Sequence, residues 1–181
     1  MTNAQNYLSE YNPLWPCWFA EIEMYLLENL SGFQRIEHVG STSVTGMVAK
    51  PIIDIDVVVA IGRMESLIEA LDKIGYGHQG DLGIAGREAF RLDGKDVRSL
   101  PAHHLYACEE GSYELMKHLS FRDYLRTFPA EAKRLADEKR RLAFHDGLSR
   151  ADYIMAKVPL VEEILRCALN WSAKAARAEI S

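Results

Sequence analysis

The sequence predicts an α+β fold in which a mixed β-sheet is flanked by helices and followed by a C-terminal helical layer. Segment 52–61 has the composition of a buried strand, apolar residues at helical spacing lie on both sides of it, and the last third of the chain is helical in pattern. The 181 residues, 48% of them hydrophobic, suffice to bury a sizeable core. We expect residues 1–110 to form the core and residues 111–181 to pack on it as helices, making one structural unit.

The first half of the chain alternates helical and extended segments. A helix should begin at Pro13, with Asn12 as its capping residue, and should end at Gly32. Strands are expected at 34–39 and at 52–61, which reads I-I-D-I-D-V-V-V-A-I and is rich in β-branched residues. A short amphipathic helix is expected at 64–74.

The second half should complete the sheet and then become helical. Residues 76–86 contain four glycines and are expected to form a loop, with strands at 87–92 and 102–108 joined by an Asp93-Gly94 turn. The helices expected after them run from Ser112 to about Thr127, from Pro129 to between His145 and Gly147, and from a Ser149–Asp152 capping box onward with a kink at Pro159.

Two aspartates lie two residues apart inside the segment 52–61. Alternate residues of a strand point to the same face, so Asp54 and Asp56 should lie side by side, with Ile53 and Ile55 on the other face. Two like charges in an apolar strand are unfavourable unless they are compensated, and a divalent cation, most naturally Mg²⁺, would compensate both. The alternative is that both aspartates are solvated at the sheet rim, or paired with Lys50 or an arginine.

A turn rich in small residues precedes this strand. Gly40-Ser41-Thr42-Ser43 lies between two expected strands, where glycine lets backbone N–H groups approach a ligand and the hydroxyls add donors. Such a turn suits the phosphates of a nucleotide beside a metal ion, although most glycine-serine pairs do no more than turn the chain. The turn and the aspartates together predict a phosphate and metal site.

These segments resemble the GrpB family, which is similar to the nucleotidyltransferase superfamily typified by DNA polymerase β and the antibiotic nucleotidyltransferases. The central match comprises the runs from Glu37 to Gly46 and from Ala49 to Asp56. Further matches are Tyr11-Asn12-Pro13 with Trp15-Pro16, Gly83 to Arg87 with Phe90-Arg91, His103-His104-Leu105, and Phe121 to Arg126. The resemblance covers about residues 8 to 170.

The resemblance implies a nucleotidyltransferase-like sheet and the transfer of a nucleotidyl group from an NTP to an acceptor, either a small molecule or a protein side chain. In such a site Gly40 and Ser41 bind the phosphates, while Asp54 and Asp56 are catalytic and bind Mg²⁺, or else Mn²⁺. The alternative is a catalytically inactive module of the same fold that binds a nucleotide or another phosphate ligand.

The strand expected at 102–108 departs from the superfamily's pattern. Active members carry a third carboxylate on a neighbouring strand, and this segment contains no acidic residue. His104 and Tyr106 share one face, and His104 is our candidate catalytic substitute, as a metal ligand or a general base. A hydrogen-bonded sheet histidine is the alternative. The missing acid is the feature that favours the inactive module.

Other basic residues are further candidates for binding phosphate, namely Lys50, Arg87, Arg91 and Lys157, with salt bridges or solvation as the alternative. A basic stripe at helical spacing would either line the same cleft or be solvated; it comprises Lys117, His118, Arg122 and Arg126. The run from Lys139 to Arg141 lies beside acidic residues and is expected to form ordinary pairs on a helix surface.

Composition restricts the partners. The formal net charge of −5 argues against nucleic acid. The three cysteines lie far apart without a CxxC pair, so neither a zinc knuckle nor a disulfide framework is predicted. The polar first ten residues and the lack of a long apolar run lead us to expect a cytoplasmic protein without a membrane partner.

Overall fold

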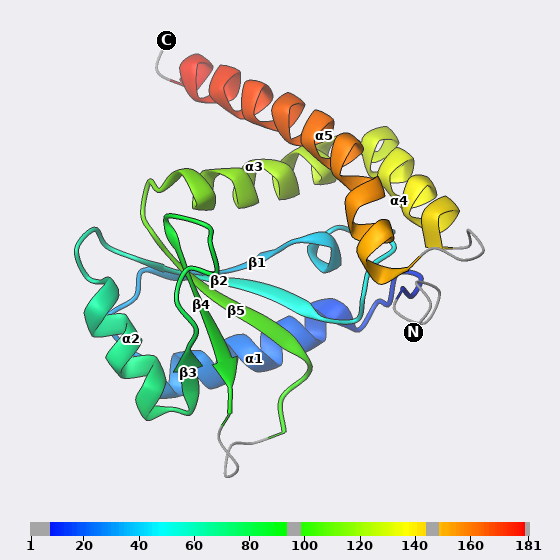
Figure 1. Cartoon of the computed structure of the whole chain (residues 1–181). Helices are drawn as coiled ribbons and strands as arrows, with labels where there is room; N and C mark the ends of the chain where they lie inside the picture. The colour runs from blue at the N-terminus through cyan, green and yellow to red at the C-terminus, as the bar shows by residue number, and fades with distance from the viewer. Residues whose placement is uncertain (1–7, 94–98, 144–148, 180–181) are drawn as a thin grey trace.

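A computed structural model of the chain describes residues 8–93, 99–143 and 149–179 (Figure 1). In chain order the elements are α1 (Trp15–Asn29), β1 (Arg35–Val39), the 3₁₀ helix η2 (Ser41–Ser43), β2 (Ile53–Val59), α2 (Met64–Lys73), β3 (Tyr76–His78), β4 (Arg87–Leu92), β5 (His103–Glu109), α3 (Tyr113–Thr127), α4 (Pro129–Ala143) and α5 (Arg150–Glu179).

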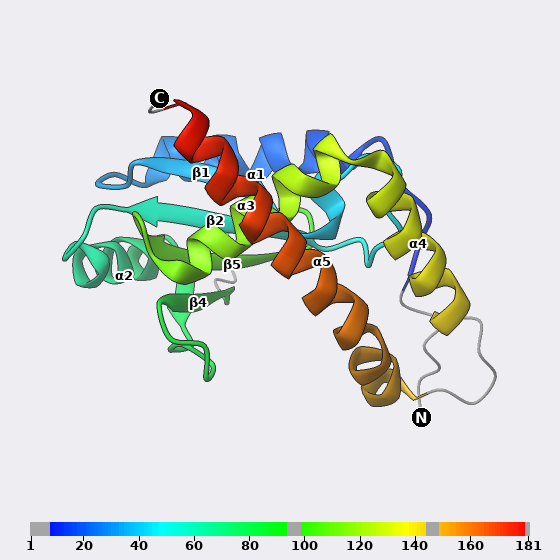
Figure 2. The same ribbon diagram turned by 90° about the horizontal axis from the view of Figure 1, so that it is seen from above.

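The strands form one sheet in the order β1-β2-β5-β4-β3. The β2–β5 pair is parallel and the other three pairs are antiparallel, so the sheet is mixed. Helices α1 and α2 cover one face, while α3 and α5 lie over the other, with α4 beside them (Figures 1 and 2). The predicted α+β fold with a C-terminal helical layer is therefore confirmed.

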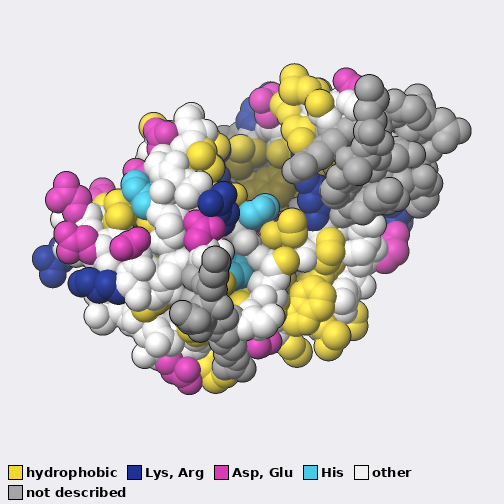
Figure 3. Space-filling view, turned by 60° about the horizontal axis from the view of Figure 1, so that its bottom comes forward, with side chains coloured by type: hydrophobic (Ala, Val, Ile, Leu, Met, Phe, Trp, Pro, Cys, Tyr) yellow, Lys and Arg dark blue, Asp and Glu magenta, His cyan; other side chains and the backbone are white. Residues whose placement is uncertain are grey.

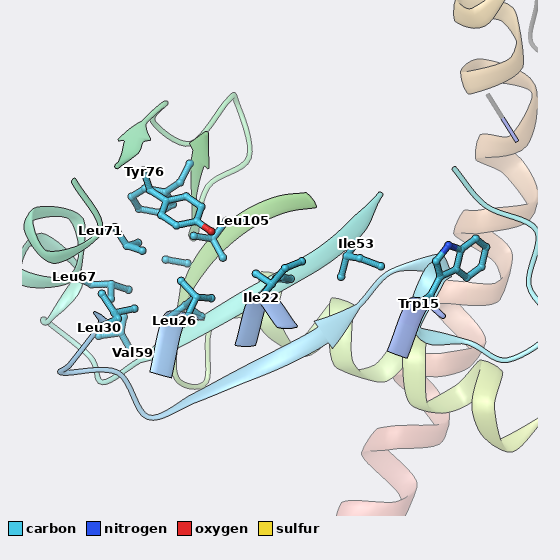
Figure 4. Packing of buried hydrophobic residues seen from close by; sticks show 14 of the residues in the cluster. Trp15, Ile22, Leu26, Leu30, Ile53, Val59, Leu67, Leu71, Tyr76 and Leu105 are labelled. Carbon is cyan, nitrogen blue, oxygen red and sulfur yellow. The ribbon is translucent and has the colours of Figure 1, made fainter. Parts of the chain in front are cut away.

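The main apolar core lies between α1, α2 and one face of the sheet (Figure 4). Ile53, Ile55 and Val57 of β2 are fully buried there, as the alternation in the sequence predicts. Helix α1 contributes Ile22 and Leu26, which are also fully buried. Burying each such side chain contributes about 1.5–3 kcal/mol, so this face supplies much of the stability of the sheet.

A second apolar cluster joins the segment before β2 to the helical layer. Val44, Met47 and Val48 are buried against side chains of α3, α4 and α5, including Leu135 and Ile164. The chain that follows the glycine-serine turn is thus fixed between the sheet and the C-terminal helices. This packing places residues of α4 and α5 close to the turn.

Most predicted elements are confirmed, and the differences have local causes. The first helix begins at Trp15 rather than Pro13, because the Asn12 side chain accepts a hydrogen bond from the Leu14 N–H at 3.0 Å and turns the chain before the helix. The expected loop at 76–86 contains the short strand β3, which forms because it pairs with β4. Ser112 caps α3 by accepting from the Leu115 N–H, as predicted.

The last helix starts at the predicted capping residues and continues past Pro159. Ser149 Oγ accepts a hydrogen bond from the Asp152 N–H at 3.2 Å, and the first turns of α5 are inclined to the rest of it in Figure 1. None of the helices that the structure describes has the length and apolarity needed to cross a membrane. The expected Asp93-Gly94 turn and the end of the fourth helix near His145 to Gly147 involve residues outside the described ranges.

Candidate functional site

Asp54 and Asp56 project from β2 toward the helical layer, on the face opposite the main core. The parallel register with β5 places His104 beside Asp54 and Tyr106 beside Asp56. The one acidic residue of β5, Glu109, falls on the opposite face by alternation, where it accepts a hydrogen bond from the Gly62 N–H. The positions beside the two aspartates on β5 therefore hold a histidine and a tyrosine.

Asp54 is the more accessible aspartate, with its side chain 32% exposed. His104 Nδ1 lies 2.9 Å from Asp54 Oδ1, and donates a hydrogen bond when the carboxylate is ionised. Gly40 has a φ of 68°, and a Cβ on it would overlap Asp54 Oδ2. Only glycine at position 40 therefore allows the turn to contact this carboxylate directly, which fixes the position of the turn relative to Asp54.

Asp56 is fully buried. Its Oδ2 lies 2.7 Å from His118 Nδ1 of α3, and His118 Nε2 lies 3.5 Å from Glu114 Oε1. Its Oδ1 has no hydrogen-bond partner among the described residues. An unpaired, buried carboxylate oxygen is unfavourable, and a bound cation on it would remove that cost.

A pocket of about 140 Å³ opens beside Asp54, between the turn and the helical layer. Figure 3 shows a hollow near the middle of this side of the molecule, with histidine and basic side chains beside it. Six of the predicted site residues line the pocket: Ser41, Thr42, Lys50, Asp54, His104 and Lys157. The other lining residues are Leu8, Ala49, Ile52, Lys139 and Tyr153.

Lys139 corrects one interpretation of the sequence. We expected a surface ion pair, but the residue is 5% exposed, and its Nζ donates to Ser41 Oγ at 2.6 Å and to the Val48 carbonyl at 3.1 Å. Burial, with a smaller effect of Lys157, lowers the pKa of Lys139 to about 7. Its neighbours Arg140 and Arg141 do form surface pairs, with Asp137 and Glu138 among others.

The hydroxyls of Thr42 and Ser43 stabilise the conformation of the turn. Ser43 Oγ donates to the Gly40 carbonyl at 2.6 Å, and a hydrogen bond of 3.0 Å joins Thr42 Oγ1 to His38 Nε2. Arg126 Nε donates to the Ser43 carbonyl at 2.9 Å. These contacts fix the backbone of the turn, which makes it a rigid support for a ligand.

Arg87 and Arg91 do not line the pocket. The Arg87 guanidinium lies over the Tyr106 ring at 4.2 Å from its centroid, and Arg91 forms an exposed ion pair with Asp93. Three members of the expected basic stripe of α3 are engaged at the sheet or the turn: His118 contacts Asp56, Arg122 donates to Glu37 Oε2 at 2.6 Å, and Arg126 binds the turn. The fourth, Lys117, pairs with Glu114 of its own helix at 2.7 Å. These arginines contact other protein groups and lie outside the pocket.

Two donor sets that share Asp56 could hold a metal ion. The first consists of the Asp54 and Asp56 oxygens, the hard ligands that Mg²⁺ prefers. In the second, one ligand atom each from Asp56, Cys108 and His118 lies within 4.8 Å of the others, a mixed oxygen, sulfur and nitrogen set typical of zinc-like ions. Sequence spacing could not show the second set, because its members come from β2, β5 and α3.

The fold and the site define an α+β domain with a small lysine-lined pocket beside Asp54, the first of two aspartates on β2. The family model described as "GrpB protein" matches residues 6–166, and the chain belongs to the GrpB family, as its motifs predicted. It is 36% identical over 163 residues to the UPF0157 protein YqkA of Bacillus subtilis, covering 89% of this chain and 46% of that protein. The chain thus spans about half the length of YqkA.

A solved structure of a GrpB protein agrees with this assignment. The crystal structure of the conserved protein GrpB from Enterococcus faecalis has a TM-score of 0.76 and 33% identity, covering 91% of this chain and 98% of that one. The Cid1 poly(U) polymerase bound to MgGTP has a TM-score of 0.49 and 13% identity, covering 70% of this chain and 42% of Cid1. The resemblance to Cid1 is distant and decides nothing about activity.

Proposed function

We propose that this protein transfers a nucleotidyl group from an NTP to an acceptor, a small molecule or a protein side chain, with the help of a divalent cation. The observation that carries the proposal is the pocket beside Asp54. It combines the Ser41-Thr42 turn with a carboxylate and with the amines of Lys50 and Lys157. Phosphates need such donors and positive charge, and a cation that bridges to them needs the carboxylate.

The two strand aspartates fit a magnesium or manganese ion. They share one face of β2, and the buried Oδ1 of Asp56 lacks a hydrogen-bond partner among the described residues. A bound Mg²⁺ would neutralise charge on the phosphates and on both carboxylates. The side chains of Asp54 and Asp56 would hold it, while Gly40 and Ser41 would offer backbone N–H groups to the phosphates.

We assign to His104 the role of proton acceptor. Its Nδ1 faces the Asp54 carboxylate, which favours the tautomer with Nδ1–H and leaves Nε2 as the acceptor. In the proposed reaction an acceptor hydroxyl forms a bond to the α-phosphorus while the bond from that phosphorus to the bridging oxygen breaks. Pyrophosphate leaves, and the hydroxyl proton passes to His104 Nε2.

A second candidate function, binding without turnover, is favoured by the composition of β5. The positions beside Asp54 and Asp56 hold His104 and Tyr106, so a third carboxylate is absent from this strand's site face. The pocket volume of about 140 Å³ is also below the 300–1,000 Å³ usual for ligand pockets. It fits phosphate groups, and the rest of a nucleotide would lie outside it. Arg87 and Arg91 would meet phosphates only if the ligand also extended toward β4.

The decisive experiment measures pyrophosphate release from a panel of NTPs and acceptors, alongside thermal shifts with each NTP with and without Mg²⁺. Asp54→Asn should abolish both signals, whereas Asp72→Asn, on the exposed surface of α2, is the matched control and should change neither. Metal-dependent shifts without pyrophosphate release identify the binding module. Neither signal in the unaltered protein, with any nucleotide, would overturn both candidates.

A further inference from the structure

We propose that the C-terminal helices complete the phosphate site, with Lys139 of α4 and Tyr153 and Lys157 of α5 contacting the terminal phosphates of the ligand. This inference rests on the proposed function only in requiring a ligand with linked phosphates. It identifies Lys139 and Tyr153 as binding residues and assigns them the pyrophosphate end of the substrate. The core would then supply the turn and the carboxylates. The helical layer would supply the lysine ammonium groups that face them.

The position of Lys139 in its helix is the first observation. The buried residues of α4 recur at helical spacing, and Lys139 is the one lysine in a series otherwise made of alanine and leucine: Ala132, Leu135, Ala136, Lys139, Leu142 and Ala143. A buried ammonium costs several kcal/mol unless an opposite charge compensates it. An apolar residue there would stabilise the helix packing better, so stability alone does not account for the lysine.

The contacts of Lys139 are the second observation. An ammonium group has three N–H donors, and two of them are bonded here to neutral acceptors, Ser41 Oγ and the Val48 carbonyl. Among the described residues no carboxylate forms an ion pair with Lys139. The group is thus buried, lacks a direct counter-ion and faces a pocket. A phosphate oxygen would supply the missing charge.

The balance of charge in the pocket is the third observation. Three lysines line it, namely Lys50, Lys139 and Lys157, whereas Asp54 is the one acidic residue among the described residues of the lining. Burial lowers the pKa of Lys157, and the charge of Lys50 lowers it further. The lysines therefore disfavour one another's charge, and an anion bound among them would relieve this repulsion.

Geometry links these lysines to the turn. Because Lys139 Nζ is 2.6 Å from Ser41 Oγ, a phosphate that rests on the turn meets the same ammonium group. Tyr153 is 5% exposed and lines the pocket, with Lys157 Nζ 5.7 Å from the centroid of its ring. Burial raises the pKa of Tyr153 to about 12, so its hydroxyl keeps its proton and can donate a hydrogen bond.

The test measures binding of inorganic pyrophosphate and of tripolyphosphate to the full chain by titration calorimetry. Lys139→Gln keeps hydrogen-bond donors for Ser41 and Val48 but removes the charge, and Lys139→Met removes both. We expect at least a tenfold loss of pyrophosphate affinity in each variant. Lys133→Met, an exposed position of the same helix that pairs with Asp137, is the matched control and should stay within twofold.

The possible outcomes separate this inference from the proposed function. Unchanged pyrophosphate affinity in a folded Lys139→Gln variant would overturn the inference, even if the protein releases pyrophosphate from NTPs. Pyrophosphate binding that depends on Lys139, in a protein that transfers no nucleotide, supports the inference while the transferase proposal fails. If both variants unfold, the Lys139 Nζ resonance of the unaltered protein decides: a shift on adding pyrophosphate supports direct contact, and no shift overturns it.

Discussion

The seven residues of β2 alternate between two faces of the sheet, and the two faces differ in how completely their side chains are paired or packed. On one face Ile53, Ile55 and Val57 are fully buried and packed on α1 and α2. On the other, Asp54 borders a pocket, and Asp56 is buried with one unpaired oxygen. The side chains of the apolar face are fully packed by other protein groups. The acidic face carries charge that the described residues do not fully neutralise, and we expect such a face to serve binding and to lower stability.

The largest expected effect is a loss of stability from a substitution in the apolar face. Ile55→Ala removes a fully buried side chain from the main core and should lower the free energy of unfolding by about 2–5 kcal/mol. Urea denaturation would measure it. Asp54→Asn, one position earlier on the other face, is the comparison and should change stability by about 1 kcal/mol or less. Equal losses in the two variants would mean that the acidic face also serves the fold.

The second prediction concerns the buried charge on the acidic side. The pKa of Lys139 is lowered to about 7 in the folded protein from its ordinary 10.5, chiefly by burial. Between these pH values the unfolded chain binds more protons, so stability due to this group rises as the pH increases from 7 to about 10. At pH 7 and below, the charged lysine disfavours the folded state.

Comparison with Lys139→Met isolates this group from Asp54, Lys157 and the other residues that titrate. Without a ligand, the variant should be at least as stable as the unaltered protein at pH 7, and its advantage should shrink toward pH 10. Urea denaturation at several pH values gives the difference. A variant that is less stable at pH 7 by an amount independent of pH would show that the hydrogen bonds to Ser41 and Val48 outweigh the buried charge.

The metal prediction distinguishes the two donor sets around Asp56. If Asp54 and Asp56 hold the ion, Asp54→Asn abolishes the extra stabilisation that Mg²⁺ or Mn²⁺ gives with an NTP, and Cys108→Ser leaves it intact. Thermal shifts measure this, with the exposed Cys167→Ser as the control for loss of a thiol. If the protein instead binds Co²⁺ with a thiolate absorption band that Cys108→Ser removes and Asp54→Asn does not, the ion lies among Asp56, Cys108 and His118.

Features that depend on a few adjacent residues could be predicted from the sequence, and features that depend on distant contacts could not. The strand at β2, the Ser112 cap and the proximity of the turn to the aspartates are contained within a few residues, and each was predicted. Strand β3 was missed because a three-residue segment containing Gly77 carries no pattern of its own and forms by pairing with β4.

The far half of the site could not be predicted in the same way. Lys139 and Ser41 are 98 positions apart, and the packing of α4 on the segment 44–48 brings them together. A usable signal did exist, since Lys139 falls on the apolar stripe of α4 rather than on its charged side. Charge alone predicts a surface position for the whole run from Lys139 to Arg141, whereas periodicity identifies its first residue as buried.

The smallest expected effect is at the edge of the acidic face. Arg91, a candidate phosphate ligand from the sequence, lies outside the pocket in an exposed pair with Asp93, and exposed pairs contribute little. Arg91→Ala should therefore change the affinity for pyrophosphate less than about twofold. Lys157→Ala, at the pocket, should lower it about tenfold, which corresponds to about 1.4 kcal/mol. Titration calorimetry on both variants makes the comparison. A tenfold loss at Arg91 would show that the bound ligand extends across β5 to β4, well beyond the space between the turn and the helical layer.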